Sequence, residues 1–98
     1  MSDLADATPA RQQLQALAAE GFPVPWLAEA IGMSPSGLGA IQKGQRTRTS
    51  AYALRAIATT YAVVHGTNPA DHGIRPGSIS LTLLAAGRHG WTQKEVTT

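Results

Sequence analysis

Apolar residues recur at helical spacing in several separate stretches of the chain, and the first stretch lies between residues 8 and 20. Thr8 is a suitable N-cap for this helix, Pro9 fits the first helical position and Gly21 is a suitable terminator. The residues that would form the buried face of this helix are Ala10, Leu14, Leu17 and Ala18.

Two short helices are predicted next, over about residues 24–31 and after Ser34. Pro25 is compatible with the first of them only because it lies in the first turn, where the backbone N–H has no helical partner. Gly32 ends that helix. Ser34 is a strong N-cap with Pro35 in the next position, and Gly44 ends the second helix.

A fourth helix is predicted to begin at a cap formed by Thr49 or Ser50 and to run to about Val64. Its buried face would consist of Leu54, Ile57, Ala58 and Tyr61. Residues 66–76 are rich in glycine and proline and are expected to form a loop. A fifth helix over about residues 77–88 is apolar on nearly every side, so it needs more than one neighbour. One face can cover the core, and the other is either a dimer surface or a second intramolecular contact; the dimer candidates are Ile79, Leu83 and Leu84.

These elements predict an all-α fold, a compact bundle of about five helices with a helix-turn-helix at its centre. With 98 residues the chain is long enough for one domain. We expect this domain to span residues 8–91, preceded by a flexible polar tail over 1–7 and followed by a frayed tail over 92–98. A domain this short buries a modest core, so pairing with a second copy would add stability.

Positive charge is concentrated in the middle of the sequence. Residues 34–70 contain four basic side chains, Lys43, Arg46, Arg48 and Arg55, and no acidic one. Residues 1–33 contain four acidic side chains and one basic one. This distribution is compatible with a polyanionic partner or with an ordinary solvated basic face.

Several classes of site are absent from the sequence. It contains no cysteine, which excludes disulfides and thiolate metal sites. No apolar stretch approaches the ~20 residues needed to cross a bilayer, and residues 1–6 do not resemble a signal peptide. No nucleophile motif, phosphate-binding glycine loop or carboxylate pair is present, so we expect neither catalysis nor a cofactor. His65, Asp71 and His72 are too weakly patterned to predict a metal site.

Residues 24–41 meet the local requirements of a helix-turn-helix. Two helices that cross steeply through a short turn need a small residue at the crossing and a glycine in the turn. Ala28 and Gly32 supply these, and the aliphatic residues that would hold the pair to the core are Leu27, Ile31, Leu38 and Ile41. Trp26 and Met33 are expected to pack around this unit rather than to contact a ligand.

This segment resembles the helix-turn-helix of the Cro/C1-type repressor family. The match comprises an apolar residue followed by alanine, glycine four residues later, and aliphatic residues six and nine positions beyond the glycine. The resemblance covers about residues 10–65. The wider sequence, from Leu14 to Trp91, also resembles small regulators of actinobacteria and their phages.

The resemblance implies that the helix after Ser34 enters the major groove of DNA. Its residues that would then contact base edges are Ser34, Ser36, Gly37, Ala40 and Lys43, with Gln42 as a further candidate. The resemblance also implies that the following loop lies along the DNA backbone, where charged and hydroxyl side chains bind phosphate. The residues expected to make these contacts are Gln45, Arg46, Thr47, Arg48, Thr49 and Ser50.

The predicted reading helix departs from a strong base-reading pattern. Gly37 and Gly39 each disfavour a helix by about 1 kcal/mol relative to alanine. Its first turn contains no Arg, Asn or Gln for a bidentate base contact. Either the small residues permit a close approach, with specificity from thymine methyls and DNA shape, or the helix reads little sequence and affinity comes from phosphates.

The function expected from the sequence is therefore sequence-specific binding of double-stranded DNA by a transcriptional regulator. We expect the regulator to repress transcription by occupying a promoter. We also expect it to bind a roughly palindromic site as a homodimer. The expected location is the cytoplasm of a bacterial or phage-infected cell, with no membrane or small-molecule ligand. The alternatives are a protein-interaction module, such as an antitoxin or anti-regulator, and an architectural or recombination accessory factor that bends DNA.

Overall fold

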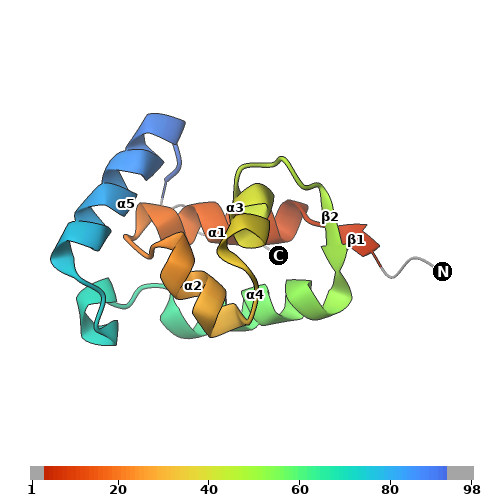
Figure 1. Cartoon of the computed structure of the whole chain (residues 1–98), viewed down its shortest axis with the longest axis horizontal. Coiled ribbons are helices and arrows are strands. Elements are labelled where there is room, and N and C mark those ends of the chain that lie inside the picture. The colour runs from red at the N-terminus through yellow and green to blue at the C-terminus, as the bar shows by residue number, and fades with distance from the viewer. Residues whose placement is uncertain (1–3, 93–98) are drawn as a thin grey trace.

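Five α-helices dominate the computed structural model, which describes residues 4–92 (Figure 1). In chain order the elements are β1 (Leu4–Asp6), α1 (Thr8–Ala19), α2 (Val24–Ile31), α3 (Pro35–Gln42), β2 (Arg48–Ser50), α4 (Ala51–Val64), the 3₁₀ helix η1 (Pro69–His72) and α5 (Pro76–His89). The predicted fold class, an all-α bundle of about five helices, is confirmed, and a small two-stranded sheet is added to it. Each α-helix agrees with its predicted range to within one or two residues.

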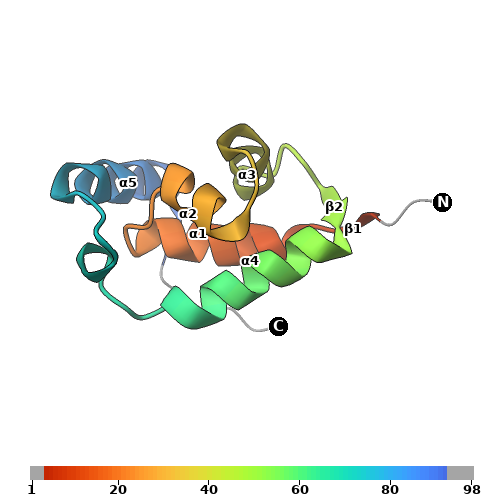
Figure 2. The same cartoon turned by 60° about the horizontal axis from the view of Figure 1, so that its bottom comes forward.

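Helix α1 lies at the centre and contacts α3, α4 and α5 (Figures 1 and 2). Helices α1 and α4 run side by side, α2 and α3 cross above them, and α5 packs at one end. The largest side chains that are fully buried between these elements are Leu14, Leu17, Phe22, Leu27, Leu38, Ile41 and Ile57. The predicted faces of α1, α2 and α3 therefore supply most of this core. On α4, Ile57 is buried, whereas Leu54 and Tyr61 pack against the core at its edge.

Hydrogen bonds to side chains fix the first turns of three helices. Ser34 Oγ accepts a hydrogen bond from the Gly37 N–H at 3.1 Å, and Ser50 Oγ accepts one from the Ala53 N–H at 3.1 Å. Ser50 rather than Thr49 therefore caps α4. The prediction that Thr8 caps α1 was wrong, because Thr8 is the first residue of the helix and Ala7 occupies the cap position. The Asp6 carboxylate accepts from the Thr8 N–H at 2.8 Å instead.

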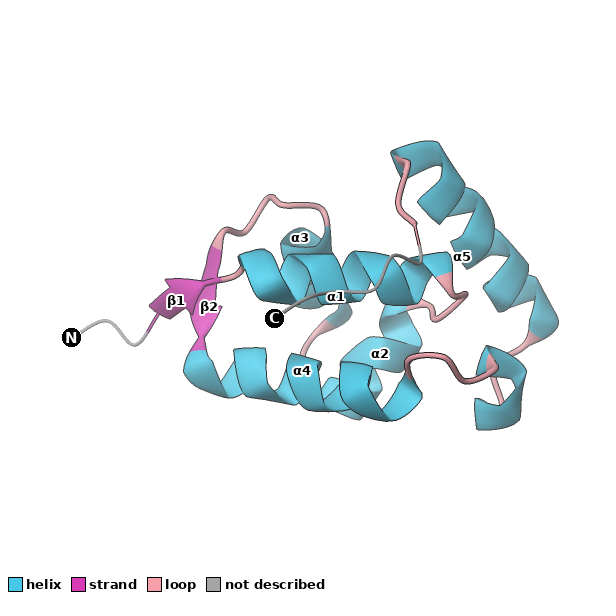
Figure 3. Cartoon of the chain, turned by 180° about the vertical axis from the view of Figure 1, so that it is seen from behind, coloured by secondary structure: helices cyan, strands magenta, loops and turns pink. Residues whose placement is uncertain are grey.

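A two-stranded antiparallel sheet links the beginning of the chain to the loop before α4 (Figure 3). Leu4 pairs with Ser50, Ala5 with Thr49 and Asp6 with Arg48. The expectation of a loose tail over residues 1–7 was therefore wrong for residues 4–7. Ala7 is buried, and its N–H donates to the Thr47 carbonyl at 2.9 Å. Three-residue strands are too short to show an alternating pattern, which is why the sequence did not reveal them.

The segment predicted as a loop between α4 and α5 contains the 3₁₀ helix η1. Asn68 caps it, because its side chain accepts a hydrogen bond from the Ala70 N–H at 3.0 Å. Pro69 and Ile74 are buried. The segment is therefore fixed against the bundle, and it sets the direction in which α5 leaves.

Helix α5 packs on α1 through a narrow face and leaves a broad apolar face exposed. Ala86 is buried against Ala18 and Ala19. Ile79 is half-buried and packs against the core beside Gly21. Leu81 and Leu84 are 69% and 58% exposed. Within residues 4–92, no helix is both long enough and apolar enough to span a membrane. Most of the predicted tail over 92–98 lies outside the described residues.

Candidate nucleic-acid interface

Helices α2 and α3 form the predicted helix-turn-helix with its apolar side turned into the bundle. The five residues expected to hold it are buried: Leu27, Ala28, Ile31, Leu38 and Ile41. Gly32 ends α2 with a φ of +88°, a conformation that is costly for residues with a Cβ atom. The Met33 N–H and the Gly32 N–H both donate to the Ala28 carbonyl, at 3.0 and 2.8 Å. The turn is thereby closed tightly, and α3 leaves at a steep angle to α2 (Figure 1).

The outward side of α3 carries small and polar side chains. Ser34, Ser36 and Lys43 are exposed, and Gly37 and Ala40 are half-buried. All five predicted base-contacting residues therefore retain some accessible surface. Ser34 Oγ is engaged at the helix cap, so its contribution to a ligand would come through its second lone pair or its hydroxyl proton.

Gln42 does not belong to this surface. Its side chain is buried, and its Nε2 donates to the Leu14 carbonyl at 2.9 Å. Gln15 Nε2 donates in turn to the Gln42 carbonyl at 2.8 Å. The candidate role of Gln42 in base contact was therefore wrong, because the last turn of α3 directs this side chain towards α1.

The loop after α3 divides into an exposed part and a buried part. Gln45, Arg46, Thr47 and Arg48 are exposed. Thr49 is only 4% exposed and does not lie on the outer surface of the loop, so its predicted contact with a DNA phosphate was wrong. It lies on β2 opposite Ala5, on the side of the strand that faces the bundle. Ser50 is half-buried and its hydroxyl caps α4.

Arg46 is the basic residue of the loop that lies nearest to α3. Its Nη1 atom is 3.6 Å from the position that a Cβ atom would occupy at Gly37. The guanidinium of Arg46 therefore lies beside the outward residues of α3. Residues 34–70 contain no acidic side chain that could neutralise it. Arg46 and Lys43 therefore form a positive edge beside the small side chains of the helix.

Arg48 is oriented by the short sheet. Its Nη2 donates to the Leu4 carbonyl at 2.9 Å, and Asp6 lies opposite it across the two strands. Hydrogen bonds from the Thr8 hydroxyl and the Thr8 N–H, with smaller contributions from Arg11 and Arg48, lower the pKa of Asp6. The carboxylate offsets part of the positive charge of Arg48, so this arginine is less free for an external anion than Arg46.

Arg11 is a basic residue that the sequence alone does not place at this site. Its Cδ and Nη1 atoms lie 3.5 Å from the position of a Cβ atom at Gly44, just after α3. In the sequence Arg11 stands among acidic residues, and only the packing of α1 beneath α3 brings it here. Its place near the start of a helix, at the edge of the apolar face beside Leu14 and Ala18, was the available signal.

Trp26, His65 and His72 are held by contacts within the bundle. Trp26 packs against the core, with its ring centroid 5.4 Å from that of Phe22 and 5.3 Å from that of His72. His65 Nδ1 lies 2.5 Å from Glu20 Oε2, and the Gly66 N–H donates to Glu20 Oε1 at 2.7 Å. These histidines therefore join helix ends. Within residues 4–92, no three His, Asp or Glu side chains are grouped in a way that could hold a metal ion.

No family model, curated protein or solved structure matches this chain.

Proposed function

We propose that this protein is a sequence-specific regulator of transcription that binds double-stranded DNA through α3. The observation that carries the proposal is the placement of Arg46 beside Gly37, at the edge of a helix whose outward residues are small. A helix of this kind fits the major groove closely, and cations at its edge bind the flanking phosphates. The resemblance of residues 24–41 to Cro/C1-type repressors supports the same proposal.

The residues proposed for base contact are Ser34, Ser36, Gly37, Ala40 and Lys43. Serine hydroxyls and an alanine methyl discriminate bases weakly, and lysine binds guanine or phosphate. We therefore expect DNA shape and thymine methyl groups to contribute much of the specificity. The phosphate contacts are assigned to Lys43, Arg46 and Arg11, with Gln45 and Thr47 as hydrogen-bond donors.

A lone helix-turn-helix covers one half-site, so useful affinity favours a homodimer on a two-fold symmetric sequence. The exposed leucines of α5 are the proposed contact. Because Ile79 packs against the core beside Gly21, the contact would use Leu81 and Leu84, with Leu83 at its edge. Repression by occupying a promoter, in the cytoplasm of a bacterial or phage-infected cell, would follow from such binding.

The test is selection of duplexes from a random DNA library at near-physiological salt, followed by anisotropy titration of the best and of a scrambled sequence. A two-fold symmetric consensus bound at least ~1,000-fold better than scrambled DNA would support the proposal. Salt-sensitive binding without a consensus would favour an accessory factor that bends DNA. Absence of binding even at low salt would contradict DNA binding altogether.

A protein-interaction module is the second candidate, and the exposed leucines of α5 favour it. Leu81 and Leu84 would then contact a different protein rather than a second copy. The mass in solution separates these possibilities. A dimer that Leu84→Lys converts to a folded monomer supports the regulator, whereas a monomeric wild-type chain supports the interaction module.

A further inference from the structure

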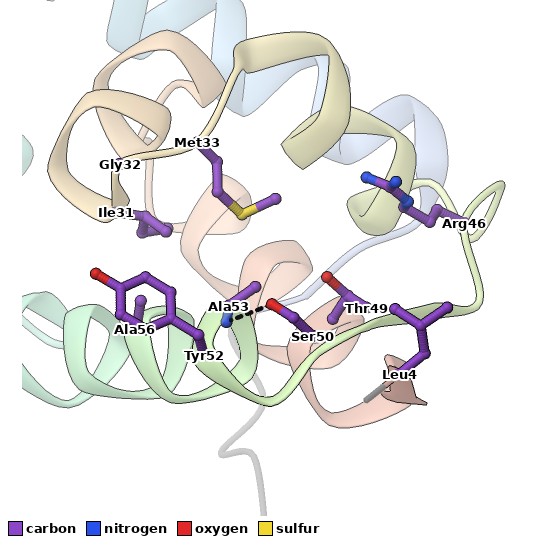
Figure 4. Close-up of a pocket in the computed structure, with 10 residues that line it drawn as sticks. All are labelled: Leu4, Ile31, Gly32, Met33, Arg46, Thr49, Ser50, Tyr52, Ala53 and Ala56. Atoms are coloured by element: carbon purple, nitrogen blue, oxygen red, sulfur yellow. Dashed lines mark hydrogen bonds between the residues drawn. The ribbon is translucent and has the colours of Figure 1, made fainter. Parts of the chain in front are cut away.

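A pocket of about 290 Å³ lies between the turn of the helix-turn-helix, the β2 strand and the first turns of α4 (Figure 4). Its volume is at the lower end of the range for small-molecule sites. One side is apolar and is formed by Ile31, Met33, Ala53 and Ala56. The ring of Tyr52 lies along this side, near Ile31 and Ala56.

The other side of the pocket carries the polar and charged groups of Thr49, Ser50 and Arg46, with Leu4 beside them. Thr49 is 4% exposed, and its hydroxyl makes no hydrogen bond to any residue between 4 and 92. Figure 4 shows this hydroxyl directed into the space between Met33 and Arg46. The hydroxyl is not among the buried polar atoms that lack a partner, so it keeps contact with the open space of the pocket. It is therefore available to form a hydrogen bond with a ligand there.

The charges around the pocket favour an anion. Arg46 lines it, and no acidic residue among residues 4–92 does. The N-terminus of α4 lies at the same place, and the first N–H groups of a helix have no intrahelical acceptor. Ser50 Oγ satisfies only that of Ala53. The helix dipole adds a further preference for negative charge.

We propose that this pocket binds a small carboxylate with a short apolar body. The carboxylate would accept hydrogen bonds from the Thr49 hydroxyl and the Arg46 guanidinium, and the apolar body would lie against Met33, Tyr52 and Ala56. The combination of one charged edge with an apolar wall excludes neutral hydrocarbons and fully hydrophilic anions as good ligands. The site is not needed for the DNA-binding proposal and stands without it.

The experiment is a titration of the whole chain, labelled with ¹⁵N, with hexanoate as the probe and amide chemical shifts as the readout. Hexanamide has the same body without the charge, and acetate and inorganic phosphate have the charge without the body. We expect saturable shifts at Thr49, Ser50 and Ala53 with hexanoate, and at least tenfold weaker binding of the other three compounds. Equal binding of any of them, or shifts confined to other parts of the chain, would overturn the proposal.

Variants separate the two sides of the site. Thr49→Val and Arg46→Gln should each weaken hexanoate binding about tenfold, because each removes a hydrogen bond to a charged group. Thr47→Val is the matched control, since Thr47 is exposed on the same loop and does not line the pocket. Ala56→Leu should fill the apolar side and abolish binding even if Thr49→Val proves poorly folded. Unchanged affinity in both Arg46→Gln and Ala56→Leu would overturn the assignment.

A consequence for regulation rests on the proposed function. Arg46 serves both the pocket and the proposed phosphate contact, so bound hexanoate should lower affinity for the selected DNA. Competition would show as a rise in the DNA dissociation constant with hexanoate and no rise with hexanamide. DNA binding that is unaffected by a saturating concentration of hexanoate would contradict this coupling, whereas the titration without DNA tests the site alone.

Discussion

Gln15 and Gln42 tie α1 to α3 through a pair of side-chain hydrogen bonds that run in opposite directions. Gln15 Nε2 donates to the backbone carbonyl of Gln42 at 2.8 Å, and Gln42 Nε2 donates to the carbonyl of Leu14 at 2.9 Å. The carbonyl of Gln42 belongs to the last turn of α3, where no intrahelical donor is available. The pair therefore satisfies a helix end and fixes α3 on the bundle.

Replacing Gln42 by methionine should destabilise the protein by about 1–2 kcal/mol, because it removes a buried hydrogen bond at similar side-chain volume. Gln12→Met is the matched control, since Gln12 is exposed on α1, and it should change stability by less than about 0.5 kcal/mol. Urea denaturation of both variants provides the measurement. Equal stability of the two would show that the buried bond contributes nothing.

Gly21→Ala should be strongly destabilising. Gly21 has a φ of +101°, and a Cβ atom there would lie 2.8 Å from Ile79 Cγ2. The backbone cost of about 1–2 kcal/mol and the overpacking cost of about 1–3 kcal/mol should act together. Gly73→Ala isolates the backbone cost, because Gly73 has a φ of +79° with nothing within 4 Å of such a Cβ. If urea denaturation shows the same destabilisation in both variants, Ile79 of α5 does not pack closely on Gly21.

Gly39→Ala should stabilise α3 by about 0.5–1 kcal/mol. Gly39 is helical, and an added Cβ atom would meet nothing within 4 Å. Gly37→Ala should stabilise α3 by a smaller amount, because its Cβ atom would lie 3.0 Å from Ser34 Oγ and would disturb the cap. Thermal unfolding of the two variants tests this order. A lower melting temperature in Gly39→Ala would mean that α3 is not helical at this position.

The proposed phosphate contacts predict a change in salt dependence. Each phosphate that is no longer neutralised should make the slope of log K against log[salt] shallower by about 0.9. Lys43→Ala and Arg46→Ala together should therefore flatten it by about twice that amount. Arg46→Ala alone, which removes no proposed base contact, should weaken binding to all sequences alike. Arg88→Ala on α5 is the control and should leave the slope of a protomer unchanged. An unaltered slope in the double variant would contradict the assignment of both residues.

The lowered pKa of Asp6 predicts that the folded protein loses stability in acid. Its pKa is lowered in the folded protein, chiefly by the side-chain hydrogen bond from Thr8 at 2.7 Å. A lowered folded pKa stabilises the fold above the unfolded pKa of about 3.9, and this contribution is lost as the pH falls through the folded value. Thr8→Val removes the largest cause, so its stability should depend less on pH below about pH 4. Urea midpoints between about pH 2 and 6 test this, and identical profiles would contradict it.

The sequence alone determined the five α-helices of this protein. Helix ranges followed from apolar spacing, and the ends of α2 and α3 followed from Gly32 and Ser34, because caps and terminators act within a few residues. The excess of positive charge in residues 34–70 was also evident from the sequence. Each of these features depends on neighbours in the chain, so no knowledge of the fold was needed to find them.

Tertiary structure decided which of the candidate side chains are accessible. Gln42 and Thr49 have polar side chains in a polar segment, and only the packing of α1 and the pairing of β2 with β1 buries them. The same packing brings Arg11 to the end of α3 and directs Ile79 towards the core. These outcomes depend on contacts between residues that are far apart in sequence, and single-residue preferences carry no information about such distances.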